Sequence, residues 1–314
     1  MRKIGAFIAT MLMITVGMTF VTATTPEFNE NHDLDTYVDN TPPVIIEGWI
    51  EILNQSGELV WSSIDSSLPR ADSYIWESEK LIVYAKIHDD NGESDLWQHT
   101  VQAWLSPEDA FITDLAIDHF VDGTNNCEAV FKGEKFIPGP DVWQCLHDIY
   151  ITDTDKYGAC ADNDELVIFD HLYINPMMSS TFENADGDDF VKWSLLHAGD
   201  EDIPADGNPY TEHVYAKCID PDTGQAVPVT VNYELWIHGT DLEGGIGVAH
   251  VIPCENVEYS MDGGLTWISL TNGEVFLGEY LASQDIIFDF RITVPLNIEM
   301  GNYAGEVGFG IKAL

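Results

Sequence analysis

The chain has 314 residues, of which 45% are apolar and 11% aromatic, and its 12 Lys and Arg residues stand against 54 Asp and Glu residues. The net charge of −42 excludes nucleic acid and anionic membrane surfaces as partners, because both repel a surface of this sign. The apolar content excludes a disordered acidic tail. A surface this acidic also repels itself and requires salt or bound divalent cations, and a halophilic source explains the charge without any specific site.

The N-terminus has the pattern of a secretory signal peptide, which we assign to residues 1–23. Arg2 and Lys3 form a short basic region, an apolar run follows, and residues 21–23 fit a small-residue cleavage site. An apolar run of about 17 residues is short for a membrane span. We therefore expect cleavage, no stable membrane span in the mature chain, and a secreted protein that is extracellular or bound to the cell surface.

Residues 24–40 carry five acidic residues and few apolar ones, which is typical of a flexible linker. Within this linker, Leu34, Thr36 and Val38 lie on one side of a short period-two alternation. The segment is thus predicted to be a linker that can supply one assembly strand when a sheet edge is offered.

Beyond residue 41 the dominant hydrophobic period is two, which indicates strands. The strand candidates are Val44–Leu53, Leu81–His88, Trp97–Trp104, Phe111–Phe120, Val142–Ile151, Glu165–Ile174, Val227–Ile237, Phe288–Val294 and Val307–Ile311. Runs with helical spacing are scarce, so the pattern predicts antiparallel sandwiches rather than a parallel α/β sheet. Because residues 175–189 are polar and rich in turn signals, we place a domain boundary near residue 178. The predicted fold is all-β, with two antiparallel β-sandwich domains at residues 41–178 and 179–314.

Two local patterns support this fold class. Thr41-Pro42-Pro43 before the first strand, together with the tight turn at residues 89–92, resembles the immunoglobulin-like modules repeated in prokaryotic surface proteins. Residues 260–267 match the S-x-D-x-G-x-T-W pattern and resemble the Asp-box of sialidases and other secreted β proteins. The residues of this structural turn are Ser260, Asp262, Gly264, Thr266 and Trp267.

The Asp-box is interpreted as a folding device rather than a catalytic one, because an Asp side chain can accept hydrogen bonds from its own turn and glycine permits positive φ. Sialidases resemble one another in an arginine triad, whereas this chain beyond its signal has only Arg70 and Arg291. A propeller also needs several similar blades, and the sequence has one box without a repeat.

Signatures of hydrolases, P-loop proteins and dinucleotide-binding enzymes are absent from the sequence, which predicts a protein that is not an enzyme. The alternative is an unrecognised metal-dependent hydrolase with zinc held by neighbouring His and Asp residues. The candidate pairs are His88-Asp89, Asp118-His119, His147-Asp148 and Asp170-His171. A chain with 54 acidic residues produces such neighbours by chance as well.

Five cysteines are an odd number for an exported protein, so at most two intrachain disulfides form. We predict one disulfide between Cys218 and Cys254 and another between Cys127 and Cys145, with Cys160 as a competing partner. A zinc site made from Cys127, Cys145, His147 and Cys160 is the alternative, although it lacks the usual C-x-x-C spacing.

Two acidic turns predict calcium as a cofactor, because Ca²⁺ prefers oxygen ligands from loops. Asp153, Asp155 and Asp164 occupy the first, third and twelfth positions of a segment that resembles an EF-hand loop, with a glycine at the sixth. The second cluster consists of Asn184, Asp186 and Asp188.

These observations favour a non-enzymatic extracellular structural or adhesive protein, such as a surface-layer or filament subunit stabilised by calcium or salt. Its expected partners are further copies of itself or other surface proteins. A carbohydrate-binding protein is the alternative, because Trp236, and also Trp104, falls on the polar side of its strand and can stack against a sugar ring.

Overall fold

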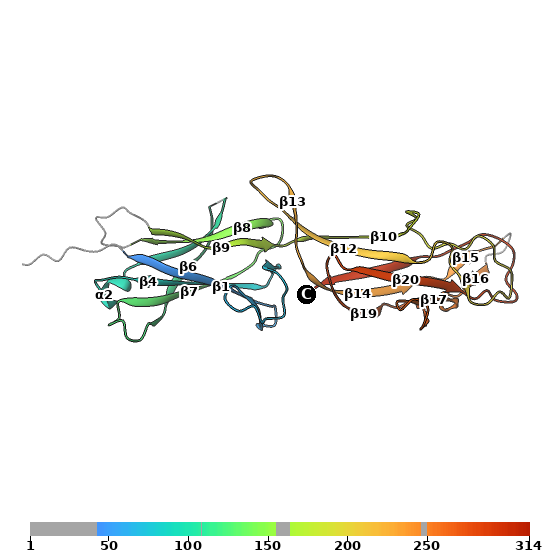
Figure 1. Cartoon of the computed structure of the whole chain (residues 1–314), viewed down its shortest axis with the longest axis horizontal. Coiled ribbons are helices and arrows are strands. Elements are labelled where there is room, and N and C mark those ends of the chain that lie inside the picture. Colours follow the sequence, from blue (N-terminus) through green and yellow to red (C-terminus); the bar gives the residue numbers. More distant parts are fainter. Residues whose placement is uncertain (1–42, 108, 155–163, 246–249) are drawn as a thin grey trace, which may run out of the picture. The chain divides into compact units, whose positions relative to one another are not determined.

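The computed structural model describes residues 43–107, 109–154, 164–245 and 250–314 (Figure 1). The predicted signal peptide, linker and assembly strand all lie outside these residues. Almost all regular structure is β-strand, which confirms the all-β class, and the described strands pair antiparallel except for β3 with β9. The short helices are α2 (Glu93–Leu96) and a 3₁₀ turn at Cys254–Asn256. No helix within the described ranges is long and apolar enough to cross a membrane.

The first part of the chain forms a nine-stranded sheet in the order β2-β1-β4-β7-β6-β5-β8-β9-β3. Its strands are β1 (Val44–Leu53), β2 (Leu59–Ser62), β3 (Tyr74–Ile75), β4 (Lys80–His88), β5 (Thr100–Ser106), β6 (Ala110–Phe120), β7 (Glu128–Phe136), β8 (Cys145–Thr154) and β9 (Asp164–Ile174). Strand β1 also packs against β9, where a Cβ atom at Gly48 would lie 2.4 Å from Cγ2 of Ile168. Glycine therefore permits this close approach.

Period-two alternation explains the core of this sheet. In β4, the side chains of Leu81, Val83, Ala85 and Ile87 have no exposed surface, as the alternation predicts. They belong to one apolar cluster with residues of β1, β5, β7, β8 and β9.

The remaining strands form three further antiparallel sheets: β10-β12-β20-β17-β18 with β11 and β13 attached, β19-β14-β22, and β16-β15-β21. The strands are β10 (Met177–Asn184), β11 (Ile203–Pro204), β12 (Tyr210–Ile219), β13 (Ala226–Pro228), β14 (Asn232–Gly239), β15 (Leu242–Gly244), β16 (His250–Ile252), β17 (Val257–Ser260), β18 (Ile268–Ser269), β19 (Val275–Leu281), β20 (Asp285–Ile292), β21 (Tyr303–Ala304) and β22 (Val307–Ala313). Their core is aromatic, with Tyr210, Tyr233, Tyr259, Phe288 and Phe290 all fully buried.

The single strand predicted at residues 227–237 is wrong, because the structure has two strands there, β13 and β14. Pro228 ends β13, since proline has no backbone N–H to donate to the ladder. The alternation within β14 is confirmed: Tyr233, Leu235 and Ile237 are buried, whereas the residues between them are partly exposed.

The nine-stranded sheet ends at Ile174 and β10 begins at Met177, close to the predicted boundary near residue 178. A third apolar cluster contains residues from both sides of this boundary, such as Leu146 and Cys218. By their contacts, residues 41–314 group together as one unit. The division into two immunoglobulin-like domains therefore stays a prediction.

Candidate functional site

His99 lies between two buried carboxylates in the first sheet. Its Nε2 atom is 3.0 Å from Oδ2 of Asp89 and its Nδ1 atom is 3.1 Å from Oδ2 of Asp153, and the three side chains have no exposed surface. A neutral imidazole has one N–H and donates to one of these carboxylates, whereas the protonated ring donates to both. In the neutral ring, the nitrogen without a hydrogen carries a lone pair, which can bind a cation.

Local backbone structure positions the cluster. Asp89 follows β4 and opens a tight turn in which its Oδ1 accepts a hydrogen bond of 2.6 Å from the backbone N–H of Asn91. Gly92 continues this turn at a φ of 84°, which glycine adopts without strain. The short helix α2 then carries Asp95, and His99 immediately precedes β5.

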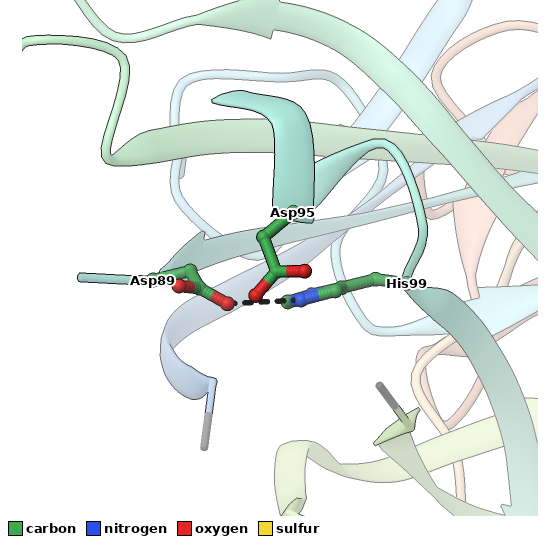
Figure 2. Close-up of side chains that lie close together, drawn as sticks. All are labelled: Asp89, Asp95 and His99. Atoms are coloured by element: carbon green, nitrogen blue, oxygen red, sulfur yellow. Dashed lines mark hydrogen bonds and ion pairs between the residues drawn. The ribbon is translucent and has the colours of Figure 1, made fainter. Parts of the chain in front are cut away.

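Asp89, Asp95 and His99 together have the geometry of a metal-binding group. One ligand atom from each lies within 4.8 Å of the others, and Figure 2 shows the three side chains turned toward one another. If Nδ1 of His99 donates to Asp153, its Nε2 is left as a ligand beside the two carboxylates. A carboxylate that orients a metal-binding histidine in this way is common at zinc sites, whereas Ca²⁺ takes oxygen ligands. The donor set therefore suits a divalent cation.

The sequence predicted only part of this cluster. Asp153 was assigned to a calcium loop, and Asp89 to a His-Asp pair. Asp155 lies outside the described residues, and Asp164 is opposite Asp153 in the pairing of β8 with β9. The predicted calcium loop therefore stays a prediction.

The second predicted calcium cluster forms a hydrogen-bonded turn after β10. Oδ1 of Asn184 accepts hydrogen bonds from the backbone N–H groups of Asp186 and Asp188, at 3.0 and 2.9 Å. The ammonium group of Lys192 lies 2.8 Å from Oδ2 of Asp188. A cation from the chain itself thus occupies the position beside this carboxylate.

The Asp-box residues form a network of hydrogen bonds within the turn between β17 and β18. Oδ1 of Asp262 accepts from the backbone N–H groups of Leu265 and Thr266, and the hydroxyl group of Thr266 donates to Oδ2. These bonds, led by the Thr266 hydroxyl, lower the pKa of Asp262 to about 2. The Oγ atom of Ser260 accepts from the N–H of Gly264, and Nε1 of Trp267 donates to the Gly264 carbonyl at 3.0 Å.

Neither predicted disulfide is present, because Cys127, Cys145, Cys218 and Cys254 are all free thiols. The backbone carbonyl of Cys127 accepts a hydrogen bond from the backbone N–H of Asp89, which lies just beyond the end of β4. Cys145 instead pairs with Ile174, which also pairs with Ile75 near the start of β4. The two cysteines therefore lie toward opposite ends of β4, which separates two ligands of the alternative zinc site. Its further cysteine, Cys160, lies outside the described residues.

Cys218 and Cys254 lie in different surroundings. Cys218 is buried with Leu146 and Ala216, whereas the Cys254 thiol contacts the carbonyl of Leu270 at 3.7 Å and Oδ1 of Asn272 at 3.5 Å. The position of both cysteines at the ends of strand-like runs does not show which sheet each strand joins.

The predicted His-Asp pairs do not converge on one site. Among the described residues, Asp89 is the one member of these pairs that belongs to a metal-binding group of three. His119 contacts its neighbour Asp118 at an exposed position, and the Nδ1 atom of His147 lies 3.2 Å from the Ser106 carbonyl.

The two tryptophans considered for glycan binding each pack against another aromatic residue. The ring of Trp236 lies 5.0 Å from that of Phe276, which is 48% exposed, and the ring of Trp104 lies 5.3 Å from that of Phe111. Nε1 of Trp104 also donates to the hydroxyl group of Thr152. Both tryptophans are half-buried, so each offers a partial stacking surface.

Strand β10 forms the edge of its sheet and pairs with β12 across all eight of its residues (Figure 1). Glu183 is its one charged residue, and Ser179, Ser180 and Thr181 are exposed. Edge strands are usually protected against pairing by charges, proline or a bulge. The chain has 54 acidic residues, yet β10 carries a single charge. This edge is therefore weakly protected against pairing with another strand.

No family model matches the chain. An uncharacterised protein of the archaeon Methanocaldococcus jannaschii is 25% identical over 335 residues, covering 95% of this chain and 93% of that protein. Among solved structures, the C-terminal domain of the AgI/II polypeptide BspA of Streptococcus agalactiae has a TM-score of 0.31 at 9% identity, covering 87% of this chain and 97% of that chain. A mutant form of the BspA C-terminal region has a TM-score of 0.33 at 8% identity, with coverage of 88% and 97%. Similarity at this level does not establish a shared family.

Proposed function

We propose that the protein is a non-enzymatic extracellular subunit of a structural or adhesive assembly, such as a surface layer or filament. The observation that carries this proposal is the weakly protected edge of β10. Among the described residues, this eight-residue strand pairs on one side only, with β12, so its other side can accept a further strand. Backbone groups at such an edge accept an added strand through main-chain hydrogen bonds.

The donor is the segment at residues 24–40 of a neighbouring copy. The added strand has two distinct faces, because Leu34, Thr36 and Val38 alternate with acidic and aromatic residues. The face that packs against the sheet sets the register of the added strand. Because this segment and the rest of the chain are acidic, subunits approach one another only when salt or calcium screens their charge.

Assembly is tested by sedimentation velocity and electron microscopy of the chain from residue 24 onward, in molar salt and in millimolar calcium. We expect assemblies under these conditions and a monomer for a variant that begins at residue 41. If both proteins stay monomeric, strand addition is wrong. A monomer that is retained on an insoluble glycan column, with retention lost in Trp236→Ala, would instead favour the carbohydrate-binding alternative.

A substitution at the edge separates strand addition from other modes of assembly. Thr181→Glu places a charged side chain at an exposed position of β10, where an added strand would cover and desolvate it without a counter-charge, a cost that salt does not remove. Ser66→Glu adds the same charge at an exposed loop position and serves as the control. We expect the first variant to assemble at least tenfold more weakly than the second.

We also propose that a divalent cation, zinc by preference because His99 supplies an imidazole nitrogen, stabilises the fold through Asp89, Asp95 and His99. At fixed ionic strength, the melting temperature is expected to be several degrees higher with a small excess of Zn²⁺ than in excess EDTA, since a ligand that binds only the folded state stabilises it. Asp89→Asn should remove this difference, whereas Asp186→Asn, in the turn neutralised by Lys192, should keep it. No difference in the unmodified chain contradicts the proposal, and a response to Ca²⁺ alone would replace zinc with calcium.

A further inference from the structure

Two free cysteines flank the short link between β9 and β10. Cys145 begins β8 and pairs with Ile174, the last residue of β9. On the other side of the link, Met177 begins β10 and pairs with Lys217 of β12, which immediately precedes Cys218. Both cysteines are therefore placed by register within a few residues of the same point in the chain.

Side-chain packing brings these strand ends together. Strands β8 and β12 are in contact, and Cys218, which is 1% exposed, shares an apolar cluster with Leu146, the residue after Cys145. Tyr173 borders the same cluster. Burial raises the pKa of the Cys218 thiol to about 12, and the Cys145 thiol adds to this rise.

We propose that Cys145 and Cys218 form a disulfide that joins β8 to β12 across the link at residues 175–176. The oxidant is a low-molecular-weight disulfide. The Cys145 thiolate attacks one of its sulfur atoms and forms a mixed disulfide, releasing one thiol; the Cys218 thiolate then attacks the Cys145 sulfur and releases the second thiol. Two cysteine thiols are thereby oxidised by two electrons, one small disulfide is reduced to two thiols, and the protons of the cysteines end on those thiols.

The order of these steps follows from exposure. Cys145 is partly exposed and accessible to the oxidant, whereas Cys218 is enclosed and reacts only with a sulfur atom delivered beside it. Because thiolate is the attacking species and the Cys218 thiol resists ionisation, ring closure is the slower step and accelerates with rising pH.

The bond would hold together two segments that are far apart in the sequence. It closes residues 145–218 into a loop, and the closure of a long loop in the unfolded chain stabilises the folded state by restricting the unfolded ensemble. The inference is independent of strand addition at β10, since it concerns one chain only.

The test uses the full chain, purified reduced and then treated under native conditions with oxidised glutathione. Remaining thiols are alkylated, and the protein is digested with trypsin and a glutamate-specific protease, because trypsin alone leaves Cys218 and Cys254 in one peptide. The predicted product links peptide 136–156 to peptide 218–234. Oxidation should also raise the melting temperature on the order of 10 °C.

Two variants make the result specific. Cys145→Ser, at a partly exposed position, should abolish both the linked peptide and the rise in melting temperature, whereas Cys254→Ser should keep both. The proposal is overturned if Cys145 and Cys218 are both alkylated after oxidation, or if Cys218 is linked to Cys254 or Cys160 instead. It is also overturned if Cys145→Ser keeps the full rise in melting temperature.

Discussion

Replacing Glu79 with glutamine is expected to lower the free energy of unfolding by about 3–5 kcal/mol, because it leaves the guanidinium group of Arg70 buried without its counter-charge. The two side chains are only 3% and 5% exposed, with Nη2 of Arg70 2.6 Å from Oε1 of Glu79. Nη1 donates to Oε2 of the same carboxylate at 2.9 Å, which makes the pair bidentate. Chemical denaturation measures the loss.

An exposed pair between β4 and β7 provides the control. Lys80 and Glu134 are 2.8 Å apart, but their side chains are 26% and 43% exposed, so Glu134→Gln should cost less than about 1 kcal/mol. Adding Arg70→Met to the Glu79→Gln variant should recover part of the loss, because the uncompensated charge is then removed. Equal costs for Glu79→Gln and Glu134→Gln would contradict this account of the buried pair.

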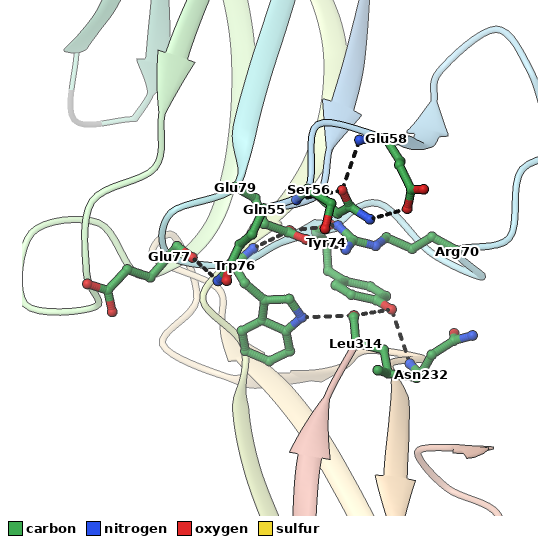
Figure 3. A network of polar contacts seen from close by, with 11 residues as sticks. Gln55, Ser56, Glu58, Arg70, Tyr74, Trp76, Glu77, Glu79, Asn232 and Leu314 are labelled. Carbon is green, nitrogen blue, oxygen red and sulfur yellow. Dashed lines mark hydrogen bonds and ion pairs between the residues drawn. The ribbon is translucent and has the colours of Figure 1, made fainter. Parts of the chain in front are cut away.

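The Arg70 pair also supports a polar network shown in Figure 3. Oε2 of Glu79 accepts the backbone N–H of Trp76 at 2.9 Å, and Nη1 of Arg70 donates to the Tyr74 carbonyl at 2.7 Å. The side chains of Tyr74 and Trp76 in turn donate to the Leu314 carbonyl at 3.1 and 3.2 Å. Loss of the ion pair should therefore loosen the contact with Leu314 as well.

Stability should fall as the pH rises from 4.5 to about 7, owing to Glu212. This residue of β12 is 1% exposed, and burial raises the pKa of its carboxyl group from 4.5 to about 7, with a smaller opposing effect from Ser180. Below pH 4.5 the carboxyl group is protonated in both folded and unfolded states and has no effect. As the pH rises above 4.5 the unfolded state ionises first, which destabilises the fold by about 3 kcal/mol once the pH exceeds 7.

Glu212→Gln removes the ionisation and should flatten this part of the pH profile. Because the acidic surface titrates in both proteins, the quantity to compare is the difference in unfolding free energy between variant and wild type. That difference should increase in favour of the variant from pH 4.5 to pH 8. A difference that does not change over this range would contradict a raised pKa at Glu212.

Strands with strict alternation could be predicted from the sequence, because burial of one face of a strand requires an apolar residue at every second position. The buried set of β4 and the alternation of β14 are examples. The break at residues 229–231 was missed although Pro228 signals it, because the apolar residues continue in phase across the break.

The candidate cation site could be predicted only in part, because its residues are brought together by sheet pairing. Asp153 lies next to His99 since β8 pairs with β5, a relation that residue order does not reveal. The four-residue spacing from Asp95 to His99 is the one signal of this site in the residue order. Strand register, which residue order does not reveal either, places Cys145 near Cys218 rather than near Cys127.

Hydrogen exchange of β10 tests the proposed strand addition most directly. A synthetic peptide of residues 24–40 is added in molar salt to the chain that begins at residue 41, and amide exchange is followed by mass spectrometry. Strand addition predicts slower exchange in residues 177–184 when the peptide is present, and loss of this protection in Thr181→Glu but not in Ser66→Glu. Unchanged exchange in residues 177–184 at saturating peptide would contradict the proposed function.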